Sequence, residues 1–366
     1  MRRDAVRVLL VDDSPTVRAV LQRILRRTPD LQVVGEAGDG ETGVRLAVEL
    51  APDLVLMDLA MPKLDGFEAT ARIMQRAPTA VMVFSTEVSV DGHRVFEAYS
   101  RGARDVLAKP GSPQDWTELA STLPERIRSV AHGFAGGTPA EAAPAPGTRS
   151  GGTPASAVDL PPAGDAGPEV DARAQPLRYL AIGASTGGPE ALRELLAELA
   201  PRPPLAVLVV QHIAPEFEEG LAEWLRADVK LDVRVARQGE TPRAGTVRLA
   251  PQGYHLTLEE GNWLRLDADT PPLRGHRPAA DLLLSSCARV AGSQTAGVLL
   301  SGMGRDGVEG LGKLKDAGGL TLVQDRASSV VYGMPRAALD ARAAATALPP
   351  AALGRYLLKA CGATRR

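Results

Sequence analysis

A stretch rich in Ala, Pro, Gly, Thr and Ser divides this 366-residue chain into two parts. It runs from about residue 133 to residue 176 and contains almost no large apolar side chains. Such a segment buries too little surface to offset the loss of chain entropy, and so long a structureless loop is rare inside one domain. We therefore predict two domains, at residues 1–130 and 177–362, joined by a Pro/Ala/Gly-rich linker at residues 131–176.

Short apolar runs alternate with helix-like segments on both sides of this linker. In the first part, the runs lie at residues 6–11, 31–36, 54–58, 80–84 and 105–108. In the second part, they lie at 178–182, 206–211, 232–236, 246–250, 295–300 and 320–324, with a hairpin-like pair at 254–258 and 263–266. This alternation predicts an α/β fold in both domains, with parallel sheets that bind ligands at the carboxyl ends of their strands.

Composition excludes several functional classes. The formal net charge of −2 argues against a nucleic-acid or membrane-surface binder. Cys287 and Cys361 have neither a disulfide pattern nor metal-binding spacing, which fits a reducing compartment. The apolar run at residues 6–11 is too short for a signal peptide core or a membrane span. We expect a soluble, cytoplasmic protein with no nucleic-acid partner and no direct membrane insertion.

Charged residues gather at the strand ends of the first domain. Asp12 and Asp13 follow the first strand, Asp58 ends the third, and Lys109 follows the fifth. Three carboxylates at one sheet edge repel one another, and a hard cation such as Mg²⁺ relieves that repulsion. Asp58 would then attack a phosphodonor and form an acyl phosphate. Any one of these residues alone would be explained as a surface turn residue, but together they favour a phosphate-accepting pocket.

The motifs around these residues are LLVDDS at 9–14, LMDLAMPKLDG at 56–66 and AKP at 108–110. They resemble those of a response-regulator receiver domain, and the resemblance covers residues 5–125. It implies that Asp58 is the phospho-acceptor, that Asp12, Asp13 and Asp58 hold Mg²⁺, and that Lys109 contacts the phosphoryl group.

Two details of this resemblance concern the residues that would respond to phosphorylation of Asp58. Spacing favours Ser85 as the hydroxyl that contacts the phosphoryl group, with Thr86 as the alternative. The family usually has Tyr or Phe three residues before the lysine, whereas this chain has Val106, so an aromatic switch cannot operate there. The resemblance also implies a cis peptide bond before Pro110.

A serine lies in a glycine-rich turn near the start of the second domain. The sequence GASTGG at 183–188 follows an apolar run and precedes a helix-like segment. Glycine permits tight backbone geometry, and a helix N-terminus offers free N–H groups to an oxyanion. Ser185 is therefore the predicted nucleophile of an acyl-transfer reaction.

Three histidines in the second domain are candidates for the base. His212 follows the apolar run at 206–211 and reaches the same sheet edge as Ser185, so it is the predicted base. His255 lies in the hairpin, where a structural role is favoured. His276 lies in a loop, where it would bind substrate or cap the next helix.

The acid that orients the base is predicted in the glycine-rich turn after residues 295–300. Asp306 lies in this turn, and its alternative role is that of an ordinary helix N-cap. The chain order Ser, His, Asp differs from the Ser, Asp, His order of α/β-hydrolases. The predicted chemistry is attack by Ser185 with His212 as base, followed by hydrolysis of the acyl-enzyme.

The second domain carries a succession of motifs: AIGASTGGP at 181–189, VQH at 210–212, GYHL at 253–256, GHRP at 275–278, SGMGRDG at 301–307 and VYGMP at 331–335. Together they resemble the catalytic domain of the chemotaxis protein-glutamate methylesterases (CheB). The resemblance implies a triad of Ser185, His212 and Asp306, with Thr186 and Met303 supporting the base and the oxyanion site.

The order receiver, linker, esterase is that family's architecture. It implies phosphorylation-activated hydrolysis of glutamate γ-methyl esters on methyl-accepting chemoreceptors, and deamidation of specific glutamines, for sensory adaptation. A chemotaxis-type histidine kinase would be the phosphodonor, Mg²⁺ would act only in the receiver domain, and ester hydrolysis would need no cofactor. The family is usually monomeric, and its unphosphorylated receiver domain packs over the catalytic cleft. The long linker predicts inhibition weaker than a short one would give.

Two other functions are compatible with parts of the pattern. The glycine-rich turn at 183–188 could cradle a pyrophosphate in a docking or nucleotide-binding module, although it lacks the G-x-G-x-x-G spacing. An esterase with the same mechanism could also act on a different protein or a small ester, because a triad does not specify its substrate.

Overall fold

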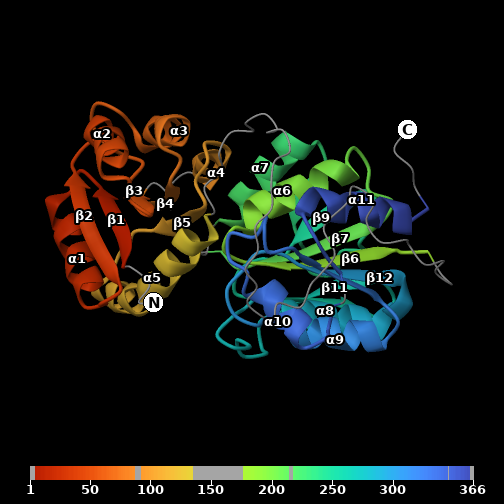
Figure 1. The fold of residues 1–366 in the computed structure, drawn as a ribbon. Helices are drawn as coiled ribbons and strands as arrows, with labels where there is room; N and C mark the ends of the chain where they lie inside the picture. Colours follow the sequence, from red (N-terminus) through yellow and green to blue (C-terminus); the bar gives the residue numbers. More distant parts are fainter. Residues whose placement is uncertain (1–4, 87–91, 135–175, 214–216, 345, 363–366) are drawn as a thin grey trace, which may run out of the picture.

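The computed structural model describes residues 5–86, 92–134, 176–213, 217–344 and 346–362. An α/β domain lies on each side of the segment 135–175 (Figure 1). Most of the predicted linker therefore falls outside the described residues. Helix α5 (Pro113–Gly133) continues past the predicted end of the first domain at residue 130.

The first domain is a five-stranded parallel sheet of order β2-β1-β3-β4-β5. Its strands are β1 (Val6–Val11), β2 (Leu31–Ala37), β3 (Leu54–Met57), β4 (Ala80–Ser85) and β5 (Asp105–Ala108). The helices besides α5 are α1 (Pro15–Arg26), α2 (Gly40–Leu50), α3 (Gly66–Arg76) and α4 (Gly92–Ser100). Strands β3 and β4 are buried at every position, as expected for parallel strands covered on both faces. Helices α1, α2 and α3 begin at side-chain caps supplied by Ser14, Asp39 and Asp65.

The second domain is a seven-stranded parallel sheet of order β14-β13-β12-β6-β7-β9-β8, with a separate antiparallel hairpin. The sheet strands are β6 (Tyr179–Ala184), β7 (Ala206–Gln211), β8 (Asp232–Val235), β9 (Thr246–Leu249), β12 (Thr295–Leu299), β13 (Leu320–Gln324) and β14 (Thr346–Leu348). The hairpin consists of β10 (His255–Glu259) and β11 (Trp263–Asp267). Both domains have the predicted α/β class.

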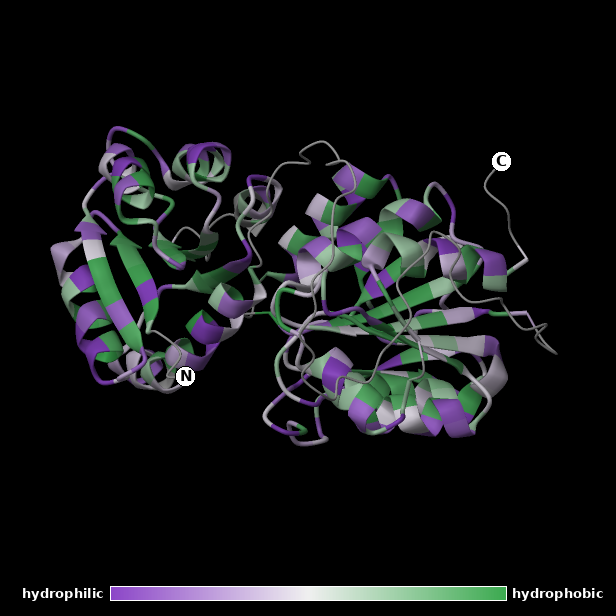
Figure 2. Cartoon of the chain, viewed as in Figure 1, coloured by the Kyte–Doolittle hydropathy of each residue, from purple (hydrophilic) through white to green (hydrophobic). Residues whose placement is uncertain are grey.

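Helices cover both faces of the second sheet (Figure 1). One layer is formed by α6 (Gly188–Leu199), α7 (Glu218–Val229) and α11 (Pro350–Ala360), and the other by α8 (Ala280–Val290), α9 (Val308–Asp316) and α10 (Met334–Asp340). Apolar residues fill the strands and the inner helix faces, and polar residues lie outside (Figure 2). No helix in the described part of the chain combines the length and the apolar character needed to cross a bilayer.

The two domains contact each other through the α4–β5–α5 side of the first domain. Helix α4 lies against α7, where the rings of Phe96 and Trp224 stack with centroids 5.8 Å apart (Figure 1). Tyr99 lies 6.5 Å from the same indole, and Trp224 Nε1 donates a hydrogen bond to Ser100 Oγ at 3.3 Å. These side chains join the two domains through a shared apolar core.

Candidate active site and acidic pocket

The first-domain residues predicted to hold a metal ion lie together. Ligand oxygens of Asp12, Asp13 and Asp58 are all within 4.8 Å of one another. Asp12 and Asp58 are buried, and Asp13 is exposed. Lys109 Nζ lies 2.6 Å from Asp58 Oδ2 and 2.8 Å from Asp12 Oδ2. Three carboxylates face one ammonium group, so the pocket carries excess negative charge. Its oxygen donors suit a hard cation such as Mg²⁺.

Burial and pairing set the charges in this pocket. Burial raises the pKa of Asp12, although hydrogen bonds from Lys109 and the Ser14 N–H oppose this. Burial alone would lower the pKa of Lys109, but its contacts with Asp12 and Asp58 raise it. The Lys109 ammonium is therefore charged at neutral pH.

The remaining switch residues lie around the end of β4. Ser85 is the buried last residue of β4, and Thr86 follows it on the surface, so the choice of switch hydroxyl stays a prediction. Val106 on β5 packs against apolar residues of both domains. The expected cis peptide before Pro110 is wrong: cis bonds in the described residues precede Pro201 and Pro278. An X-Pro bond favours trans unless its surroundings select cis.

In the second domain, the predicted catalytic residues follow three adjacent strands. Ser185 follows β6, His212 follows β7, and the loop after β12 carries Asp306. Because the sheet order is β12-β6-β7 and all three strands are parallel, their carboxyl ends meet at one edge. His212 Nε2 and Asp306 Oδ2 are 2.8 Å apart.

Asp306 is 2% exposed and accepts three hydrogen bonds. Besides His212, it receives the Ala280 N–H at 2.7 Å and the Asp281 N–H at 3.0 Å, both from the first turn of α8. Burial would raise the pKa of Asp306, but these hydrogen bonds hold it below its usual value. The alternative of an ordinary N-cap for the following helix is wrong, because Gly307 occupies that position.

Ser185 is held by its backbone. Its N–H donates to the Ser301 carbonyl at 3.0 Å, and its carbonyl accepts from Gln211 Nε2 at 2.8 Å. A Cβ atom on Gly302 would lie 2.8 Å from Ser185 Cβ, so only glycine allows this approach. The same Gln211 amide donates to the His212 carbonyl at 3.0 Å. Gln211 thus links the turn of the predicted nucleophile to the predicted base, a role that its place at the end of an apolar run did not indicate.

Thr186 and Met303 line the same cavity as Ser185 and His212. Thr186 is buried, and its carbonyl accepts from Ser301 Oγ at 2.7 Å. Met303 Sδ lies 3.8 Å from Ser129 Oγ on α5 of the first domain. The loop predicted to support the oxyanion is therefore in direct contact with the first domain.

The other two histidines have different environments. His255 is fully buried, where Nδ1 accepts from the Ala279 N–H at 3.2 Å and Nε2 lies 3.2 Å from the Pro271 carbonyl. This agrees with the structural role favoured for it. His276 stacks on His212, with centroids 3.9 Å apart and planes inclined by 5°. Helix α8 has Ala279 as N-cap with no side-chain bond, so the capping role expected as an alternative for His276 is wrong.

The first domain lies over the predicted catalytic residues. A cavity of about 430 Å³ is lined by Ser185, His212 and His276 on one side, and by first-domain residues that include Tyr99, Val106 and Arg126 on the other. The Arg126 guanidinium pairs with the buried Asp105 carboxylate, with Nη2 to Oδ1 at 2.8 Å. Ser185 therefore lies in a cavity that the first domain helps to enclose.

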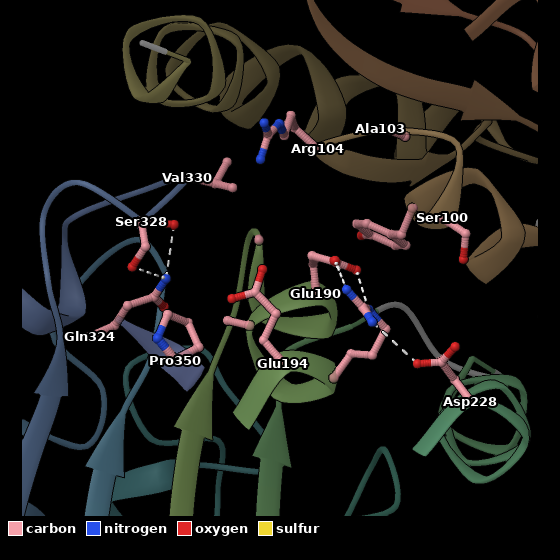
Figure 3. A pocket seen from close by; sticks show the side chains of 15 residues that line it. Ser100, Ala103, Arg104, Glu190, Glu194, Asp228, Gln324, Ser328, Val330 and Pro350 are labelled. Atoms are coloured by element: carbon pink, nitrogen blue, oxygen red, sulfur yellow. Dashed lines mark hydrogen bonds and ion pairs between the residues drawn. The ribbon is translucent and has the colours of Figure 1, made fainter. Parts of the chain in front are cut away.

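A second cavity, of about 440 Å³, lies farther along the same domain interface (Figure 3). Arg104 projects into it from the first domain, and Glu190 and Glu194 from helix α6. Burial lowers the pKa of Arg104 while the two glutamates oppose this effect. Glu190 pairs with Arg193, whereas Glu194 makes no ion pair within the described residues. Opposite charges of the two domains thus face each other across this cavity.

Comparison with known protein families identifies both domains. Residues 8–121 match the response regulator receiver domain, and residues 180–357 match the CheB methylesterase domain. The class of protein is thus a response regulator whose output domain is a methylesterase domain with an α/β fold.

Curated relatives match nearly the whole chain. A protein-glutamate methylesterase/protein-glutamine glutaminase 2 of Anaeromyxobacter dehalogenans is 42% identical over 96% of this chain and 96% of its own length. A protein-glutamate methylesterase/protein-glutamine glutaminase 1 of Cupriavidus pinatubonensis is 39% identical over 98% of this chain and 99% of its own. The crystal structure of the Thermotoga maritima CheB methylesterase catalytic domain is 34% identical, with a TM-score of 0.49, and covers 50% of this chain and 98% of that chain. The chain belongs to the CheB family of protein-glutamate methylesterases/protein-glutamine glutaminases.

Proposed function

We propose that this enzyme hydrolyses glutamate γ-methyl esters and deamidates specific glutamines on methyl-accepting chemoreceptors, using Ser185, His212 and Asp306. The observation that carries the proposal is the 2.8 Å contact between His212 Nε2 and Asp306 Oδ2 in the cavity that Ser185 lines. The names of its full-length relatives support the substrate class.

The first step is attack by Ser185 Oγ on the ester carbonyl. Asp306 holds His212 Nε2, so Nδ1 is the nitrogen free to take the serine proton, and Nδ1 is buried without a partner in the described structure. The imidazolium then gives this proton to the leaving methoxide, which departs as methanol. Water attacks the acyl-enzyme with the same base and releases the glutamate. A glutamine follows the same path with ammonia as the leaving group.

The tetrahedral oxyanion would lie at the start of helix α6. This helix begins after Gly187, at φ 77°, and has no side-chain cap. The Gly188 N–H donates to the Ser185 carbonyl at 2.8 Å and Pro189 has no N–H, so the Glu190 N–H is the next one that the helix end offers. Such N–H groups stabilise negative charge. We propose that Thr186 and Met303 support this site and the base.

We propose that phosphorylation of Asp58 controls access to this cleft. Asp12, Asp13 and Asp58 would hold Mg²⁺, whose chemistry there is to neutralise phosphoryl oxygens. Asp58 attacks the phosphorus atom of the donor's phosphohistidine, the P–N bond breaks and the imidazole leaves, and Lys109 would hold one oxygen of the resulting acyl phosphate. Ser85, or alternatively Thr86, would donate a hydrogen bond from its hydroxyl group to another phosphoryl oxygen. A chemotaxis-type histidine kinase is the proposed donor.

The interface supports this form of control. The contact between Ser129 and Met303 places α5 on the proposed oxyanion loop, and the first domain covers Ser185. Phosphorylation would weaken this docking and expose the cleft to a receptor helix. We propose that the first domain spans residues 1–130, the linker 131–176 and the second domain 177–362. We further propose that the enzyme is cytoplasmic and monomeric and serves sensory adaptation. Its ester hydrolysis would need no cofactor.

A substrate comparison tests this function. Methylated chemoreceptor signalling fragments and small methyl esters would be incubated with the phosphodonor-treated enzyme, and methanol measured. We expect release from the receptor fragments that is lost in Ser185→Ala. Release from small esters alone would contradict the receptor assignment. A serine-directed phosphonate that fails to label Ser185 would contradict the proposed nucleophile.

A further inference from the structure

The ring of His276 lies flat against the ring of the proposed base. Their centroids are 3.9 Å apart and their planes are inclined by 5°. The His276 ring makes no hydrogen bond within the part of the chain that the structure describes. Its contact with His212 is thus one of stacking.

A tight turn fixes His276 in this position. The N–H groups and carbonyls of Leu273 and His276 bond to each other at 2.9 and 3.0 Å. Between them, Arg274 (φ 53°) and Gly275 (φ 86°) both adopt left-handed geometry, as in a hairpin turn. Arg274 also pairs with Glu309 on α9. The ring is therefore presented by an anchored turn.

The next residue anchors the turn on its other side. The Arg277 carbonyl accepts from the Gly253 N–H at 3.1 Å, and Arg277 Nη1 donates to the Ala268 carbonyl at 2.7 Å. His276 is thus held by the contacts of Arg274 and Arg277 on either side and by the turn itself. A side chain fixed in this way can restrict the ring that it touches.

The charges around the pair favour a neutral His276. Burial and the neighbouring His212 lower the pKa of His276, while Asp306 opposes them. The other titratable side chains lining the cavity come from the first domain: Tyr99, Asp105 and Arg126, of which the last two pair with each other. When His212 is protonated, the Asp306 carboxylate lies at the edge of its ring and the uncharged ring of His276 lies on its face.

We propose that His276 is a positioning residue for the reaction of Ser185: its ring holds the plane of His212 so that one nitrogen stays on Asp306 and the other faces the nucleophile. This inference rests on the proposed function for the identity of the ester. It also assigns a role that neither substrate binding nor helix capping describes. This positioning role requires a flat ring at residue 276 and does not require a second titratable nitrogen.

Two variants of His276 distinguish the positioning role from other roles. Their methanol release would be measured in the full chain with Mg²⁺ and a small phosphodonor. His276→Ala removes the ring, and we expect kcat for methanol release to fall about 10- to 100-fold, as for a misplaced catalytic group, with KM little changed. His276→Phe keeps a flat ring, and we expect it to restore most of the rate. A rise in KM at constant kcat would overturn the proposal in favour of substrate binding. An alanine variant as active as wild type, or a folded phenylalanine variant as slow as alanine, would also overturn it.

A titration tests whether the two rings lie against each other in solution, as the proposal requires. The ring protons of His276 would be followed by NMR against pH in the wild-type chain and in His212→Gln. Because His212 lowers the pKa of His276, we expect that pKa to rise when His212 is replaced. An unchanged pKa would contradict the proposed coupling of the two rings.

The rate at which a serine-directed phosphonate labels Ser185 distinguishes the two hypotheses. If wild type releases no methanol from receptors but labelling still slows in His276→Ala and recovers in His276→Phe, the receptor substrate is wrong and the positioning role stands. If receptors release methanol but neither rate responds to His276→Ala, the positioning role is wrong and the proposed function stands.

Discussion

The acidic pocket of the first domain and the catalytic cleft of the second are both built at the carboxyl ends of parallel strands, but their charges differ. The pocket places three carboxylates around Lys109 alone, so it is incomplete without a further positive charge. In the cleft, Asp306 is satisfied by His212 and two backbone N–H groups. We therefore propose that the pocket responds to the ligand that binds it, whereas the cleft is preformed and is controlled through access of the substrate.

The largest effect is expected from the cleft. In Asp306→Asn, the amide can point its NH₂ group at His212. His212 would then lose its preference for the tautomer that carries the proton on Nε2 and leaves Nδ1 free as the base. We expect kcat for methanol release to fall about 10⁴-fold, with and without phosphodonor. Circular dichroism would verify folding. A folded variant within tenfold of wild type would contradict the assigned role of Asp306.

The pocket should affect stimulation and leave basal turnover in place. We expect Asp58→Ala to retain basal methanol release but to lose a stimulation by phosphodonor of about tenfold or more. Chelation of Mg²⁺ in wild type should have the same outcome. Full stimulation of Asp58→Ala would refute control through this carboxylate.

A smaller effect is expected from the charges that face each other across the domain interface. Arg104→Glu places a fourth acidic side chain around the second cavity, beside Glu190, Glu194 and Asp228 (Figure 3), and should raise basal activity about two- to fivefold. Glu194→Arg should do the same. The double charge swap is the matched control and should return the basal rate towards wild type. If the increases in basal rate of the two single variants instead add up in the double variant, these charges do not hold the domains together.

The smallest effect is on stability, and it should have opposite signs in the two sites. In metal-free buffer at neutral pH, Asp12→Asn relieves carboxylate repulsion and should raise Tm by a few degrees. Asp306→Asn should lower Tm at neutral pH, because the pKa of Asp306 is lowered by folding. That stabilisation is present above its unfolded pKa and is lost as the pH falls through the folded one. The Tm difference for Asp306→Asn should therefore shrink in acid, which a calorimetric pH series would measure.

Residues directly after strands, or in the loops that follow them, could be predicted from the sequence. Ser185, His212 and Asp306 each follow an apolar run, and parallel strands must bring such positions to one edge. The same reasoning placed Asp12 and Asp58 together. The α/β class followed from the alternation of elements.

Contacts set by loop conformation or by domain docking could not be predicted. The stacking of His276 on His212 depends on a turn with two left-handed residues, one of which is Arg274. The contact of Phe96 with Trp224 depends on how two separately folded sheets dock. Strand β14 was missed because its three residues carry no periodic pattern of their own.

We propose that the pocket at Asp58 controls hydrolysis at Ser185. The most direct test measures methanol release from methylated chemoreceptor signalling fragments, with and without a small phosphodonor, for wild type, Ser185→Ala and Asp58→Ala. The account predicts release that requires Ser185 and that rises with phosphodonor only when Asp58 is present. Absence of release from every methylated receptor, while Asp58 still accepts phosphate, would contradict the account and direct attention to another ester.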